Sequence, residues 1–84
     1  MNIKVLGPGC VNCTNLQKLV QEVVGELGVE ASVEKITDFK EIAKYGIMST
    51  PGLVINEVVK WSGSVPNKAK VNELITTELA KEGS

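Results

Sequence analysis

The 84-residue sequence has no histidine, only two cysteines, and no long basic or apolar run. The absence of histidine excludes a His-based catalytic triad and a mixed Cys/His metal site. With a net charge of −1, the chain is a poor candidate for binding nucleic acid or an anionic membrane. The apolar stretch before Gly7 is too short for a secretory signal peptide, and no later stretch is long enough to span a bilayer. We therefore expect a soluble protein of the cytoplasm.

Length and composition fit one small globular domain. Eighty-four residues can bury a modest core, and an apolar fraction of 43% is ordinary for a folded chain. No repeat, low-complexity segment or linker interrupts the sequence. We expect residues 1–84 to fold as a single domain and to be monomeric.

Apolar spacing predicts an α/β chain with the order β-α-β-α-β-β-α. Apolar side chains recur at helical spacing from Leu16 to Leu27, and Asp38 and Asn67 are expected to begin two further helices. Glu57 suits a two-residue turn with positive φ poorly, so a wider hairpin loop is expected. The strand–helix–strand start predicts parallel pairing of the first two strands. The expected strands form a four-stranded mixed sheet flanked by three helices, and they span residues 2–6, 31–36, 53–55 and 58–61.

The three aromatic residues are assigned to structure, as is Val59. Trp61 and Val59 are expected to share one face of the last strand and to belong to the core. Tyr45 and Phe39 are expected to pack around the short second helix. None of the four is therefore placed in the functional site.

Cys10 and Cys13 stand between the first strand and the first helix, after a Gly7-Pro8-Gly9 turn. Exposed N–H groups and the helix dipole favour a thiolate there. A contribution of up to ~2 kcal/mol corresponds to roughly 1.5 pKa units, enough to bring a thiol pKa from about 8.5 to about 7. No other strong cationic activator is visible beside the motif. Cys10, the more exposed, is predicted to be the attacking nucleophile, and Cys13 the resolving thiol.

The spacing of the cysteines leaves other uses open. A Cys10–Cys13 disulfide closes too short a loop to constrain the unfolded chain much, so a reversible couple is favoured over a staple. A tetrahedral metal site usually needs four ligands, and the chain offers two thiols with no second pair. Two thiolates could still hold Cu(I), so a soft-metal carrier is an alternative. A redox-sensing adaptor without turnover is another.

Several segments together resemble the thioredoxin/glutaredoxin fold. The sequence has a strand, the Cys-x-x-Cys motif and a helix, followed by the run 44–51 that ends in Thr50-Pro51, a hairpin, Ser62-Gly63 and a last helix. The first strand and helix of thioredoxin are missing, which is similar to the compact archaeal and bacterial redox-active disulfide proteins. The resemblance covers nearly the whole chain. It implies a thiol–disulfide oxidoreductase that needs no cofactor and no metal.

The resemblance also implies a substrate site and two partners. The Thr50–Pro51 bond is expected to be cis and to lie beside the disulfide, so that a substrate segment can pair with Thr50 in a strand-like manner. Val11, Met48 and Thr50 are expected to form a small apolar patch, and Gly63 to border it. The partners implied are a protein with a disulfide and a reductase that acts as electron donor.

The chain departs from the family pattern around the motif. Gly9 replaces a tryptophan, and the pair between the cysteines is Val11-Asn12. Residues between the cysteines tune the reduction potential, so the family pattern does not assign this couple a value between those of thioredoxin and glutaredoxin. Lys4 occupies the position of a buried aspartate that transfers protons in thioredoxins. The amine of Lys4 is expected to favour the thiolate, or to pair instead with Glu34 on the neighbouring strand, or to extend to solvent near the strand end.

Overall fold

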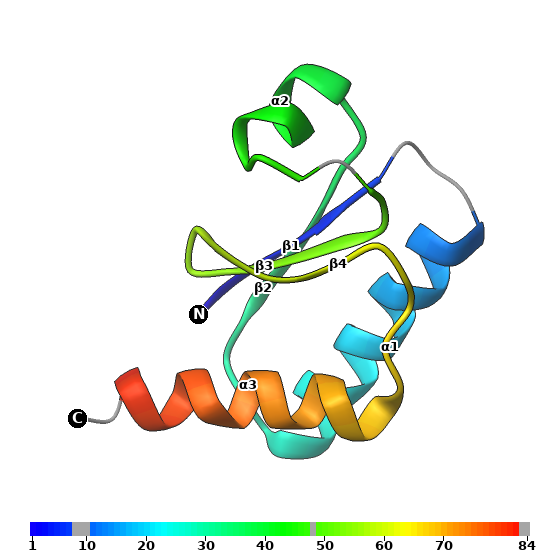
Figure 1. Cartoon of the computed structure of the whole chain (residues 1–84). Coiled ribbons are helices and arrows are strands. Elements are labelled where there is room, and N and C mark those ends of the chain that lie inside the picture. The colour runs from blue at the N-terminus through cyan, green and yellow to red at the C-terminus, as the bar shows by residue number, and fades with distance from the viewer. Residues whose placement is uncertain (8–10, 48, 83–84) are drawn as a thin grey trace.

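The strands and helices follow the order expected from the apolar spacing (Figure 1). The structure is a computed structural model, and it describes residues 1–7, 11–47 and 49–82. Among the helices of these ranges, none combines the length and the apolarity needed to cross a membrane. The elements are β1 (Asn2–Leu6), α1 (Val11–Leu27), β2 (Ser32–Ile36), α2 (Phe39–Lys44), β3 (Gly52–Ile55), β4 (Val58–Ser62) and α3 (Lys68–Glu82).

The four strands form one mixed sheet in the order β2-β1-β3-β4. Strands β1 and β2 are parallel, as the strand–helix–strand start predicts, with Leu6 opposite Ile36. Strand β3 runs antiparallel to β1 and to β4. Figure 1 shows α1 and α3 together on one side and α2 on the other. The predicted α/β fold class, with four strands and three helices, is confirmed.

Alternation along β1 divides the core between the two faces of the sheet. Ile3 and Val5 belong to the large cluster with α1 and α3, whereas Leu6 belongs to the smaller one with α2. Most of the apolar burial therefore lies on the α1 and α3 side. The fully buried residues of that cluster are Ile3, Val5, Leu16, Val20, Val23, Leu53, Ile55, Val71 and Ile75.

Both predicted N-caps are present. The Asp38 carboxylate accepts a hydrogen bond from the Lys40 N–H at 2.8 Å, and the Asn67 side chain accepts one from the Lys70 N–H at 2.8 Å. The expectation that Phe39 packs around α2 is wrong, because its side chain is 69% exposed. The buried residue of α2 is Ile42, and Phe39 belongs to neither hydrophobic cluster of the described residues.

The hairpin loop is shorter than expected. Its two residues, Asn56 and Glu57, have φ values of +51° and +68°, so the predicted wider loop is wrong. Tertiary contacts hold this conformation: the Asn56 amide donates to Glu78, and the Glu57 carboxylate accepts from Lys4 and Tyr45. These contacts offset the roughly 1–2 kcal/mol that left-handed backbone costs a residue with a side chain.

A bulge changes which way the side chains of β4 point. Val54 pairs with Val59 but Leu53 pairs with Trp61, so Lys60 is an extra residue in the register. Trp61 consequently packs on the α1 and α3 side, and Val59 packs on the α2 side. The prediction that Trp61 and Val59 share a face is wrong for this reason.

Candidate active site

The described part of the Cys-x-x-Cys motif lies in the first turn of α1. Cys13 is the third residue of the helix, and its side chain is buried. Cys10 and Met48, both expected in the site, lie outside the described residues. The first turn of α1 contains no acidic residue, so the positive end of the helix dipole is not neutralised from within the helix. This setting favours negative charge on sulfur.

Gly7 is a site residue that the sequence analysis treated only as part of a turn. Its N–H donates to the Ile36 carbonyl at 2.8 Å, which extends the β1–β2 pairing by one residue. A methyl group on Gly7 would overlap the Cys13 Sγ and would lie 3.0 Å from the Cys13 Cβ. The thiol group of Cys13 therefore packs directly against bare backbone. A glycine at the end of a buried strand, just before a reactive motif, is the sequence signal for such a close approach.

The Thr50–Pro51 segment lies on the same side of Gly7 as the Cys13 side chain. The same methyl group would lie 3.9 Å from the Thr50 Cβ, and Leu6 pairs with Gly52 in the sheet. The Thr50–Pro51 peptide bond is cis, as the resemblance implies. Pro51 is buried and Thr50 is half-buried. The structure thus brings Cys13 and Thr50 together beside Gly7.

Gly63 borders the same region. Its N–H donates to the Pro51 carbonyl at 3.0 Å, directly after the end of β4. Its φ of +96° is a backbone conformation that residues with a side chain rarely adopt. Val11, at the start of α1, is 74% exposed. Of the expected substrate residues that the structure describes, Thr50, Pro51 and Gly63 are thus directly connected, and Val11 opens the helix that carries Cys13.

The expected Lys4–Glu34 pair is wrong. The two residues are opposite each other in the β1–β2 register, but the Lys4 Nζ lies 2.7 Å from the Glu57 Oε1 and 3.0 Å from the Tyr45 hydroxyl. Hydrogen bonding to Glu57, and then to Tyr45, raises the pKa of Lys4 above its ordinary value. The same ammonium lowers the pKa of Glu57. The Lys4 ammonium thus bonds to Glu57 in the hairpin turn and to Tyr45 at the end of α2, and not to Glu34 on the adjacent strand.

Lys4 also lies on the face of the sheet away from α1. It alternates with Ile3 and Val5, which face α1 and α3, and it contacts Tyr45, which packs on the α2 side. A cation that the sequence analysis did not identify contacts the residue directly after the motif. The Lys35 Nζ donates to the Thr14 Oγ1 at 3.4 Å, and Thr14 directly follows Cys13. Within the described ranges Lys35 has no carboxylate partner at ion-pair distance.

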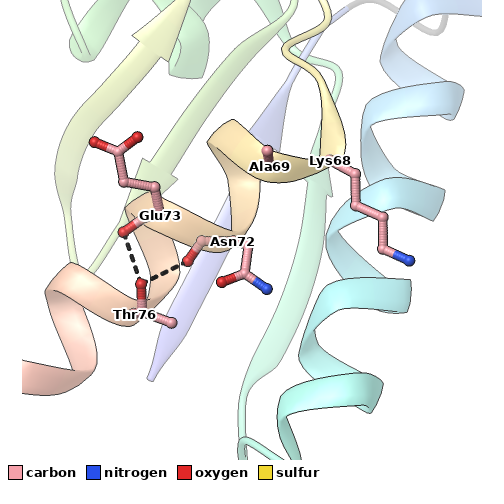
Figure 2. A pocket seen from close by; sticks show the side chains of 5 residues that line it. All are labelled: Lys68, Ala69, Asn72, Glu73 and Thr76. Atoms are coloured by element: carbon pink, nitrogen blue, oxygen red, sulfur yellow. Dashed lines mark hydrogen bonds between the residues drawn. The ribbon is translucent and has the colours of Figure 1, made fainter.

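A surface cavity of about 620 Å³ lies on α3, away from the motif (Figure 2). Lys68 at its border forms ion pairs with Glu22 and Glu26, which follow Cys13 by nine and thirteen residues along α1. At 1.5 Å per residue this is roughly 14–20 Å from the thiol. The cavity therefore contributes nothing to the candidate site. Its lining consists of Lys68, Ala69, Asn72, Glu73 and Thr76.

Comparison with known proteins gives a consistent result. Residues 1–76 match the model of a family described as thioredoxin domain. A thioredoxin of Methanothermobacter thermautotrophicus is 36% identical over 76 residues, which cover 90% of this chain and 99% of that protein. A thioredoxin of Methanocaldococcus jannaschii is 32% identical over 77 residues, which cover 92% and 88%. The structure of the germline-specific thioredoxin Deadhead of Drosophila melanogaster superposes with a TM-score of 0.62 over 90% of this chain and 78% of that one. At 17% identity, the last likeness concerns the fold alone.

Proposed function

This chain belongs to the thioredoxin family and is a thiol–disulfide oxidoreductase, and we propose that Cys10 and Cys13 are its redox couple. The Cys10 thiolate attacks one sulfur of a target disulfide. The target S–S bond breaks, one target thiolate leaves, and a mixed disulfide forms. Cys13, after losing its proton, attacks the Cys10 sulfur and releases the second target thiolate. Two electrons pass to the target, its two thiolates take up protons, and the Cys10–Cys13 disulfide remains.

The burial of Cys13 against Gly7 is the observation that best supports these roles. A buried sulfur in the first turn of α1 is poorly accessible to a large target, and the sequence places the other cysteine of the motif only three positions earlier. That is the requirement for a resolving thiol. The attacking role consequently falls to Cys10, near the positive end of the helix dipole.

The substrate is proposed to bind along the Thr50–Pro51 segment, beside Gly7 and Cys13. Thr50 supplies backbone for strand-like pairing, and Pro51 and Gly63, which are joined by a hydrogen bond, border it. Val11 offers exposed apolar surface at the start of α1, and Met48 is assigned to the same patch. These residues fit an extended peptide that holds a disulfide near the motif.

The family implies protein disulfides as substrates and a reductase as electron donor. We place the protein in the cytoplasm, as a single-domain monomer whose couple a thioredoxin-reductase-like enzyme restores. The Cu(I)-carrier alternative is not favoured, because the strand and helix order is that of a thioredoxin fold and differs from the ferredoxin-like order of copper chaperones.

Insulin reduction, driven by a chemical reductant, tests the roles of the two cysteines. The Cys10→Ser variant is expected to lose turnover, and the Cys13→Ser variant to accumulate mixed disulfides with the substrate. Equal activity in the two variants would contradict the assignment. Tight stoichiometric Cu(I) binding without any disulfide exchange would favour the carrier alternative instead.

A further inference from the structure

Phe39 is an aromatic residue that the fold leaves in water. The chain has only three aromatic residues, and the other two, Tyr45 and Trp61, are partly buried with their polar atoms hydrogen-bonded. Phe39 is 69% exposed. Single exposed apolar residues are common, so exposure alone assigns no role. The position of Phe39 relative to the redox motif is what makes it informative.

Nothing in the local structure requires a phenylalanine at this position. Asp38 caps α2 by accepting from the Lys40 N–H, and the buried residue of the helix is Ile42. Phe39 is the first residue of α2 and belongs to neither hydrophobic cluster of the described residues. A polar residue would serve the helix equally well and would improve its solubility.

The edge of the sheet places Phe39 near the point where the motif leaves β1. Leu6 and Ile36 are paired at the ends of the parallel strands β1 and β2, and the Gly7 N–H donates to the Ile36 carbonyl. The chain therefore leaves both strands at the same edge. It enters α1 at Val11 on one face of the sheet and α2 at Phe39 on the other, and Figure 1 shows both helices beginning on the side where β1 ends.

We propose that Phe39, which begins α2 on the other face of the sheet from α1, is a second docking contact for protein substrates. This inference rests on the proposed function. The occupant is a protein with apolar residues around its disulfide, because that disulfide must reach the motif that follows β1, and Phe39 follows the strand that ends beside β1. A small disulfide reaches the motif without covering Phe39. The docking surface at Phe39 is therefore proposed to adjoin the site where thiol–disulfide exchange takes place.

The chain supplies a matched control for this surface. Three large apolar side chains are exposed among the described residues: Val11, Phe39 and Val58. Val58 begins β4 beside the hairpin turn, and it pairs with Ile55, which in turn pairs with Ile3 near the start of β1. It therefore lies at the opposite edge of the sheet. Val58→Ala removes exposed apolar surface without touching the proposed docking edge.

The test compares kcat/KM for insulin with kcat/KM for 5,5′-dithiobis(2-nitrobenzoic acid), a small disulfide. Phe39→Ala is expected to lower the insulin-to-small-disulfide ratio by about five- to tenfold, where tenfold corresponds to about 1.4 kcal/mol. Phe39→Trp should restore most of the ratio, and Val58→Ala should leave it unchanged. The unfolding temperatures of all variants are measured alongside, to show that the fold is intact.

Several results would overturn the proposal. An unchanged ratio in Phe39→Ala would exclude docking at Phe39, and an equal loss with both substrates would indicate a structural effect. A concentration-dependent dimer of the wild type that Phe39→Ala abolishes would assign the surface to a second copy of the chain. A wild type inactive on both disulfides would instead contradict the proposed function, so the two failures are distinguishable.

Discussion

Gly7→Ala is expected to destabilise the protein by forcing Cys13 out of its position. The added methyl group would overlap the Cys13 Sγ and would lie 3.0 Å from the Cys13 Cβ. Neither atom can yield easily. The Sγ is buried and is only one bond from the Cβ, and the Cβ is fixed by the first turn of α1. Either the thiol must leave its rotamer, or the start of α1 must move away from β1.

The size of the effect follows from the cost of inserting a methyl group into a packed interior. Overpacking of this kind typically costs about 1–3 kcal/mol. In a domain of this size, each kcal/mol shifts Tm by roughly 4–8 °C, so we expect Tm to fall by about 4–24 °C. The lower backbone entropy of unfolded alanine offsets at most about 1 kcal/mol of this cost.

Gly25→Ala is the matched control for Gly7→Ala. Gly25 lies within α1, and a methyl group there meets no atom within 4 Å. The same substitution should therefore stabilise the protein by roughly 0.5–1 kcal/mol. Urea unfolding of the reduced proteins, followed by circular dichroism, measures both changes with the same assay.

A double-mutant cycle with Cys13→Ala locates the clash. Removing the Sγ leaves only the tight contact with the residue-13 Cβ, so the Gly7→Ala penalty should fall to less than half in that background. A Gly7→Ala protein as stable as wild type would refute the packing of Cys13 on Gly7. A penalty that is equal in both backgrounds would show that the sulfur is not the atom displaced.

Three further predictions concern charges and a helix cap. Glu57→Gln should destabilise the protein at pH 7, and the difference from wild type should shrink as the pH is lowered through the acidic range. The reason is that Lys4 lowers the folded-state pKa of Glu57, so its contribution is present above the unfolded value near 4.3 and is lost as the pH falls through the folded value. Lys35→Met should raise the midpoint of the pH profile for alkylation of the motif thiols, whereas Lys18→Met, which removes an exposed cation of α1, should not. Asn67→Ala should cost about 1 kcal/mol in urea unfolding, because it removes the N-cap of α3.

Features set by local sequence were predictable. The apolar alternation of β1 and the helical spacing of α1 depend on burying one side of each element, and both elements appear at the expected places. The caps at Asp38 and Asn67 depend on a side chain that reaches its own backbone, so a few neighbouring residues determine them. Such interactions need no knowledge of the rest of the fold.

Features set by contacts between distant residues were not predictable. Glu57 adopts positive φ because Lys4 and Tyr45 hold its carboxylate, and these partners are separated from it by 53 and 12 positions. Trp61 faces the α1 side because Lys60 is accommodated as a bulge, which no alternation rule anticipates. The contact between Gly7 and Cys13 likewise exists only once α1 has packed against the sheet.

The two sides of the sheet determine which lysine can influence the thiols. Lys4 is close to the motif along the chain, but it points to the α2 side, where Glu57 already balances its charge. Lys35 is far along the chain, yet it pairs with Val5, which faces α1, and its ammonium contacts Thr14. A charge acts through distance and the medium between the groups, so we expect a cation beside α1 without a carboxylate partner in the described residues to have the larger effect on a thiolate. The lysine at the family's aspartate position is therefore expected to stabilise the hairpin, and Lys35 to tune the redox pair.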